Sequence, residues 1–402
     1  MRPQSALPAA KCLLAVLILL VGSRAASAQS NTRLLLSSGW GVPAHYGFAF
    51  GPFRGLAMNE AREMAFLSSL RGAKSDLAAV VRSSGVTFSV VAFQGLRAPV
   101  PKAVYESFSA PSINGSGQIA FTAGLKDDVP ASAVIRVDGD SALAVVSSGN
   151  AVPDKPDATF QEFSAPVLTS AGNIVFGARL GGKQPGSGLF FWTSKGLKSV
   201  ALPPEIVLKP SDLLIPAFAS HDEAVFVSRG ASTEAVTEQI FRVVANQSYQ
   251  DLRPQPEETE AAEILPARAG EPSVKLLFVL AEGEEVRTAV LAGDATAAVK
   301  AKKSEKSPPL TLGRIQAQTA GPSGNVIFAA APAEQPADLA LFCYCQGELR
   351  RLTSPEEFLP VTGPAQRKPI LSLSGDGQHT MAFIAPAEAA SDATAIYVVS
   401  VP

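Results

Sequence analysis

The sequence predicts an all-β fold built from repeated antiparallel sheets, and three observations lead to this prediction. A short apolar pattern that ends in phenylalanine returns at intervals of 50–55 residues, at Phe66, Phe121, Phe176, Phe226, Phe278, Phe328 and Phe383. Apolar and polar residues alternate in short runs joined by Gly-, Asn- and Asp-rich turns, as in antiparallel strands. The chain also has 31 prolines among its 402 residues, which argues against a helical repeat because proline breaks helices.

One repeat shows the expected strands clearly. Its four short runs are residues 108–113, 118–125, 133–137 and 142–146, separated by turns of the type Asn-Gly-Ser-Gly and Asp-Gly-Asp. A repeat of this length buries its apolar face on its neighbours. Four-stranded sheets that return about every 53 residues predict the blades of a β-propeller. The alternative is a parallel β-helix, whose coils are shorter and lack such hairpin turns.

The two ends of the chain predict how the ring closes. Residues 33–43 precede the first repeat and resemble residues 143–153, which contain a fourth strand, at an offset of 110 residues or two repeats. The last repeat, in turn, reaches Pro402 directly after its third strand. We therefore expect a seven-bladed β-propeller of four-stranded antiparallel blades, in which a strand at about residues 33–37 completes the last blade. This pairing would remove two exposed sheet edges.

The first 28 residues have the features of a secretory signal peptide. Two basic residues, Arg2 and Lys11, precede an apolar run at residues 12–21, and small residues at 26–28 fit a cleavage site before Gln29. A run of ten apolar residues is too short to span a bilayer, which takes about 20 in a helix. The sequence thus predicts an exported protein, periplasmic or extracellular, with residues 29–402 forming one domain and no membrane span after cleavage.

The net charge of the chain narrows the classes of partner to be expected. Without residues 1–28 the 34 basic residues fall to 31 against 36 acidic ones, a net charge of −5. Such a surface argues against nucleic acid or an anionic membrane as partner.

Only two cysteines, Cys343 and Cys345, remain after signal cleavage. At this spacing on a strand the two side chains point the same way and make a poor disulfide, so we expect free thiols, with a strained or intermolecular bridge and a metal site as alternatives.

One repeat carries a motif that resembles a known group of proteins. Asn114-Gly-Ser-Gly-Gln-Ile-Ala-Phe121 fits the pattern N-x-x-G-x-x-A-F, and residues 172–176, residues 324–328 and Asn59 with Ala65-Phe66 match it in part. The chain therefore resembles the bacterial exported proteins with tandem NxxGxxAF repeats. Residues 374–377 with Ala382-Phe383 are similar to the shorter repeats of TolB-like propellers. The first resemblance implies export and a propeller-like array, and it implies no catalytic residue.

The sequence offers little support for catalysis, a metal or a cofactor. Its three histidines are His45, His221 and His379, with no H-x-x-x-H or C-x-x-C spacing of the kind that holds a metal. No G-x-S-x-G nucleophile motif is present. We therefore expect no catalytic residue, no metal and no cofactor, although a Ser-His-Asp arrangement across blades stays open.

The better candidate for a binding site is a set of loops. In a propeller, the loops that join the fourth strand of one blade to the first strand of the next lie on one face around the channel. The expected loops are residues 38–52, 94–107 and 147–162. The first carries Trp40, His45, Tyr46 and Phe48, the densest aromatic cluster of the chain, and the second carries Tyr105. The candidate ligand-binding residues are Trp40, His45, Tyr46 and Tyr105; in the alternative, the aromatic rings of the first loop pack beneath it and seal the ring closure.

Three classes of function follow. The first is a secreted module that binds a protein or a cell-envelope polysaccharide, since exposed aromatic residues with a polar tip serve both kinds of ligand. The second is a structural component of the envelope. The third is a glycan hydrolase or lyase that uses residues from several blades. Propellers host all three classes, so the fold does not decide between them.

Overall fold

The computed structural model describes residues 32–72, 75–126, 130–183 and 185–200, separate strands between residues 215 and 375, and residues 380–387 and 393–400. The predicted signal peptide, His221 and His379 lie outside the described residues, as do the side chains of Cys343 and Cys345. All regular elements in the described part are β-strands, and every strand pairing is antiparallel. This pairing rules out the parallel β-helix for the described strands.

The described strands form seven sheets, numbered here in chain order. The first sheet contains β2 (Ala49–Met58), β3 (Glu63–Arg71), β4 (Asp76–Ser84) and β5 (Thr87–Phe93). The second contains β6 (Val104–Phe108), β7 (Ser112–Ile113), β8 (Ile119–Lys126), β9 (Ser132–Asp138) and β10 (Ser141–Ser147). The third contains β11 (Ala151–Val152), β12 (Lys155–Phe163), β13 (Val167–Leu168), β14 (Ile174–Gly182), β15 (Gly186–Thr193) and β16 (Gly196–Val200).

The remaining sheets follow in the same order. The fourth sheet contains β17 (Ile215–Ser220), β18 (Glu223–Ala231), β19 (Val236–Val244) and β20 (Gln250–Asp251). The fifth contains β21 (Leu276–Glu282), β22 (Glu285–Ala292) and β23 (Ala295–Val299), and the sixth contains β24 (Leu312–Ala320), β25 (Val326–Pro332), β26 (Ala340–Cys345) and β27 (Glu348–Arg351). The seventh contains β28 (Ser372–Gly375), β29 (Thr380–Pro386), β30 (Thr394–Ser400) and β1 (Thr32–Ser37).

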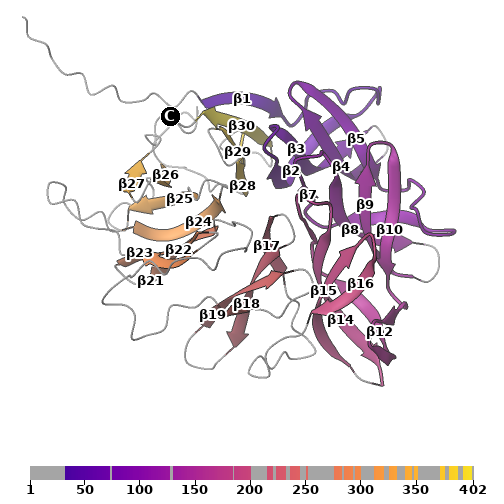
Figure 1. Ribbon diagram of the computed structural model, residues 1–402. Coiled ribbons are helices and arrows are strands. Elements are labelled where there is room, and N and C mark those ends of the chain that lie inside the picture. Colours follow the sequence, from indigo (N-terminus) through magenta and orange to yellow (C-terminus); the bar gives the residue numbers. More distant parts are fainter. Residues whose placement is uncertain are drawn as a thin grey trace, which may run out of the picture.

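At six of the sheet boundaries, the first strands of the two sheets contact each other. β21 contacts β24, β24 contacts β28, β28 contacts β2, β2 contacts β7, β7 contacts β13, and β13 contacts β17. In Figure 1 the labelled sheets follow one another in chain order around a common centre, with β2, β7, β17, β24 and β28 on the inner side. The fourth strands, such as β5 and β10, lie at the far edge of their sheets.

The first strand of the chain completes the seventh sheet, as the sequence predicts. β1 pairs antiparallel with β30, with Arg33 opposite Val398 and Ser37 opposite Ala395. The order β1-β30-β29-β28 places β1 in the position of a fourth strand. Residues more than 350 positions apart are therefore held by backbone hydrogen bonds, and the outer edge of β30 is covered.

One predicted strand is wrong in its bounds. Residues 108–113 were expected to form a single strand, but the structure has β6 ending at Phe108 and β7 beginning at Ser112. Pro111 has no N–H to donate to β8, and the Ser109 hydroxyl instead accepts a hydrogen bond from the Thr122 N–H at 2.9 Å. The first strand of this sheet is thus split in two.

The recurring phenylalanines form the core of their sheets. Phe66, Phe121, Phe176 and Phe383 are fully buried. In the first three sheets each packs edge-on against an aromatic ring of the first strand, with ring centroids 5.5–5.7 Å apart, in the pairs Phe53–Phe66, Phe108–Phe121 and Phe163–Phe176. This geometry suits the charge distribution of aromatic rings, and it explains why the pattern returns once per sheet.

Candidate binding surface

In the described part of the chain, three connecting loops join the fourth strand of one sheet to the first long strand of the next: residues 38–48, 94–103 and 148–154, the last of which includes the short strand β11. They are shorter than the sequence predicts, because β2, β6 and β12 begin before the expected loop ends. The second residue of each loop is a glycine with a positive φ: Gly39 at 92°, Gly95 at 87° and Gly149 at 84°. Only glycine adopts this backbone at little cost, so the three loops leave their sheets in the same way.

The same hydrogen bonds hold all three loops. The N–H of each of these glycines donates to the carbonyl of a buried aromatic residue in the next strand, and that residue's N–H donates to the carbonyl of the residue after the glycine. The pairs are Gly39–Phe50 and Phe50–Trp40, Gly95–Tyr105 and Tyr105–Leu96, and Gly149–Phe160 and Phe160–Asn150, at 2.6–3.0 Å. The residue after the glycine is therefore presented on an ordered backbone.

The first connecting loop presents two aromatic side chains to solvent. Trp40, which follows the glycine, is 49% exposed, and Tyr46 is 98% exposed. Backbone hydrogen bonds from Val42 to Phe48, from His45 to Val42 and from Phe48 to His45 order the loop between them. Gly39 and Gly41 flank Trp40, and Gly47 follows Tyr46; all three lie in open space.

The other aromatic residues of this loop face inward. Phe48 is partly buried against the core of the first sheet, and a Cβ atom added at Gly72 would lie 2.7 Å from its ring. The His45 ring packs edge-on against Phe93, with ring centroids 6.0 Å apart. Because Phe93 ends β5, this contact places the first connecting loop beside the start of the second. Inward packing therefore applies to Phe48 and His45 only, while the rings of Trp40 and Tyr46 stay accessible.

Tyr105 does not lie on this surface, contrary to the expectation from its loop. It is only 3% exposed and packs against Phe108 and Phe121 in the core of the second sheet. Burial raises the pKa of its hydroxyl to about 12. Phe50 and Phe160 occupy the equivalent positions, 55 residues before and after it, and both are buried. Alignment of the three repeats at this position would have identified Tyr105 as a core residue.

The second loop adds apolar surface next to the first. Leu96, which takes the position of Trp40 in the repeat, is 37% exposed, and Arg97 and Lys102 are exposed beside it. In the third loop Asn150 takes this position and is exposed. The surface formed by residues 38–48 and 94–103 therefore carries exposed aromatic and apolar side chains together with two exposed basic ones.

Among the described residues, no group of three or more His, Cys, Asp or Glu side chains is placed to hold a metal ion. No helix in that part of the chain is long and apolar enough to cross a membrane.

Comparison with solved structures finds similarity at low sequence identity. An acylaminoacyl peptidase from Pyrococcus horikoshii is 10% identical with a TM-score of 0.48, over 84% of this chain and 49% of that protein. Prolyl oligopeptidase B from Galerina marginata is 11% identical with a TM-score of 0.46, over 83% and 47% of the two chains. A Hadza microbial sialidase is 11% identical with a TM-score of 0.38, over 87% and 65%. The chain thus spans about half the length of either peptidase, and at these scores none of the three informs on activity.

No curated protein matches the chain. A family model described as a family of unknown function (DUF7453) matches residues 22–133, which include the first connecting loop and most of the first two sheets.

Proposed function

We propose that this chain is an exported seven-bladed β-propeller that binds a protein or a cell-envelope polysaccharide through the surface formed by its first two connecting loops, without converting the ligand chemically. The seven antiparallel sheets, their order around a common centre and the pairing of β1 with β30 support the propeller. The features of residues 1–28 support export.

The observation that carries the binding role is the exposure of two aromatic rings on an ordered loop. Apolar area left in water costs about 25 cal/mol per Å², and the fold gains little from Tyr46, which is almost fully exposed. The hydrogen-bonded backbone lowers the entropy lost when a ligand orders the loop. A ligand that covers both rings would recover this free energy, and the polar tips of Trp and Tyr would orient it.

Two kinds of ligand suit different parts of this surface. Trp40 and Tyr46 are exposed and stand beside glycines that have open space around them, which favours a flat ligand such as the sugar rings of a polysaccharide. The exposed Leu96 on the adjacent loop extends the apolar area, which favours a protein partner with an apolar anchor.

The test uses the processed protein against a glycan array and as bait in a native envelope fraction. Trp40→Ala and Tyr46→Ala are each expected to weaken binding at least tenfold, which corresponds to about 1.4 kcal/mol. The matched control is Val86→Ala. Val86 is 78% exposed but lies in the turn between β4 and β5, at the end of the sheet away from the connecting loops.

Unchanged affinity in both aromatic variants, for every ligand detected, would refute the proposed surface. Equal loss in Val86→Ala would point to a general effect of exposed apolar residues. Release of shortened glycans during incubation would replace the binding role by the hydrolase or lyase alternative, and absence of any ligand would favour the structural one.

A further inference from the structure

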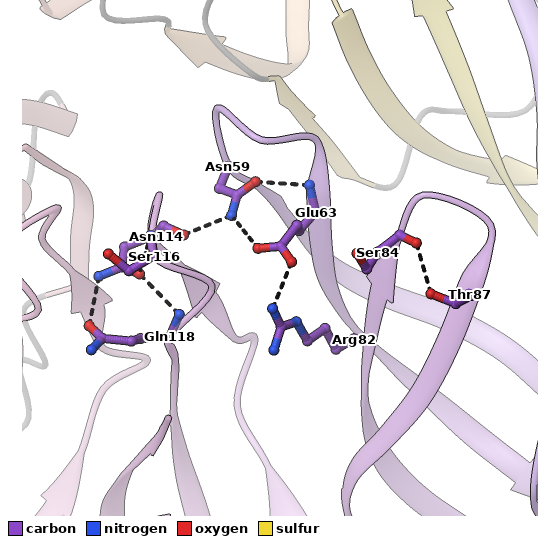
Figure 2. A network of polar contacts seen from close by, with 8 residues as sticks. All are labelled: Asn59, Glu63, Arg82, Ser84, Thr87, Asn114, Ser116 and Gln118. Atoms are coloured by element: carbon purple, nitrogen blue, oxygen red, sulfur yellow. Dashed lines mark hydrogen bonds and ion pairs between the residues drawn. The ribbon is translucent and has the colours of Figure 1, made fainter. Parts of the chain in front are cut away.

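Asn59 and Asn114 occupy the first position of the repeat motif and cap the turn that follows the first strand of their sheets. The Oδ1 atom of Asn59 accepts a hydrogen bond from the Glu63 N–H at 2.8 Å. The Oδ1 atom of Asn114 accepts from the N–H groups of Ser116 and Gln118 at 3.2 and 3.0 Å. Figure 2 shows the two turns side by side.

The amide end of the same side chains reaches the next sheet. The Nδ2 atom of Asn59 donates to the carbonyl oxygen of Asn114 at 2.8 Å, and the Nδ2 atom of Asn114 donates to the carbonyl oxygen of Thr169 at 3.0 Å (Figure 2 shows the first of these bonds). Each partner lies 55 residues further along the chain. Both asparagines are 5% exposed, so the bonds are shielded from water. A carboxamide suits this position because it carries an acceptor and donors on one short side chain.

The glycine of the motif lies at the same sheet boundaries. Gly117 and Gly172 have φ values of 73° and 82°. A Cβ atom at Gly117 would lie 2.5 Å from Arg82 and 2.7 Å from Glu63 of the preceding sheet. A Cβ atom at Gly172 would lie 2.6 Å from Gln118. The glycine thus leaves room for the polar side chains of the preceding sheet.

The hydrogen bonds from Asn59 to Asn114 and from Asn114 to Thr169 link the first three sheets, and the contacts on either side of this series differ. At one end, the Ser374 hydroxyl of the seventh sheet accepts from the Met58 N–H of the first sheet at 2.9 Å. At the other end stands Thr169, whose hydroxyl accepts from the Asn173 N–H at 3.0 Å and so caps its own turn. Threonine has no amide group to donate onward. Counted back from the motif phenylalanine, the other four repeats have Ala219, Glu271, Gly321 and Asp376 at this position, none of them a carboxamide. The seventh sheet is joined to the first by the hydroxyl groups of Ser372, Ser374 and Thr394 instead.

We infer that the motif asparagine is a latch between neighbouring sheets, and that it divides the ring into two sectors. The seventh, first, second and third sheets form a latched sector that opens as one unit. The fourth, fifth and sixth repeats have no carboxamide at this position in the sequence, and we expect their sheets to open separately. Four further bonds cross boundaries inside the latched sector, at 2.6–3.0 Å: Phe53 N–H to Thr394 Oγ1, Leu56 N–H to Ser372 Oγ, Leu168 N–H to Ser112 Oγ, and Thr122 Oγ1 to the Ser164 carbonyl.

Native-state hydrogen exchange at increasing urea tests this division, since it reports the opening of separate cooperative units. The amides of β3, β8, β14 and β29 are expected to exchange together, at a higher urea concentration than those of β18, β22 and β25. A single transition for all seven sheets, or exchange of β14 together with β18, would overturn the two-sector inference.

Substitutions at residue 114 isolate the latch. Asn114→Thr keeps the turn cap, as Thr169 does in the third sheet, but removes the donor to that sheet. The amides of β14 are expected to exchange about tenfold faster than in the wild type, the size of one buried hydrogen bond, while those of β3 stay unchanged. The matched control is Asn150→Thr, in the third connecting loop.

Equal exchange of β14 in Asn114→Thr and Asn150→Thr would overturn the latch. If Asn114→Thr does not fold, Thr169→Asn provides the test in the opposite direction. It adds the missing carboxamide beside the fourth sheet, whose β17 contacts β13. Exchange of the β18 amides is then expected to slow several-fold, and an unchanged rate would refute the role of the asparagine.

Discussion

Replacement of Gly117 by alanine is expected to destabilise the fold in two ways. The first is conformational: a non-glycine residue at the φ of 73° found here costs about 1–2 kcal/mol. The second is steric, because the new Cβ would lie within 2.7 Å of the Glu63 and Arg82 side chains of the neighbouring sheet. Those side chains form an ion pair at 2.6 Å and are largely shielded from solvent, so their displacement costs about 1 kcal/mol more.

Gly85→Ala is the matched control. Gly85 also lies in a turn with a positive φ, 64°, but nothing lies within 4 Å of an added Cβ. Its replacement therefore carries the conformational cost alone. We expect Gly117→Ala to lower the free energy of unfolding by about 2–3 kcal/mol and Gly85→Ala by about 1–2 kcal/mol.

Urea denaturation measures both variants, with the midpoint and slope compared with those of the wild type. The Glu63 carboxyl gives a second readout in Gly117→Ala, because displacement of Arg82 and Asn59 would return its lowered pKa towards the ordinary value. Equal destabilisation by the two alanines, together with an unchanged Glu63 pKa, would refute the view that this glycine makes room for the ion pair.

Two further predictions concern single side chains. Tyr105→Phe is expected to change the free energy of unfolding by about 1 kcal/mol or less and to leave ligand binding unchanged, because phenylalanine fills this position in the neighbouring repeats; a binding defect without loss of stability would return Tyr105 to the site. Burial raises the pKa of Glu63, but hydrogen bonds from Arg82 and Asn59 and the charge of Arg82 outweigh it and lower the pKa overall. The stability advantage of wild type over Glu63→Gln is therefore expected to be constant near neutral pH and to shrink as the pH falls below about 4.5 through the folded pKa; an advantage that grows on acidification would contradict this assignment.

The strands were predictable from the sequence because their pattern is local. In the second sheet, three of the four expected strands agree with β8, β9 and β10 to within one residue at each end. Alternation of apolar and polar residues follows from one buried face, and the turns carry their own glycine and asparagine signals. The split of the first strand was missed, because it depends on where β8 offers hydrogen bonds opposite Pro111.

The candidate site was predictable only in part. Loop position and residue type led to Trp40 and Tyr46, and both are exposed. The same reasoning included Tyr105, because a residue near a loop end can face either solvent or core, and only packing decides which. The exposure of Leu96 and the contact of His45 with Phe93 also depend on neighbouring strands.

The amino-acid sequence by itself determined the all-β class, the repeat length and the partner of the first strand, since each is written in residue spacing and in the similarity of one segment to another. The tertiary structure alone decided how the sheets are joined. The Asn59 and Asn114 amides bond to carbonyls 55 residues away, and such a bond requires two turns to be brought within about 3 Å of each other, a proximity that exists only after the sheets have packed.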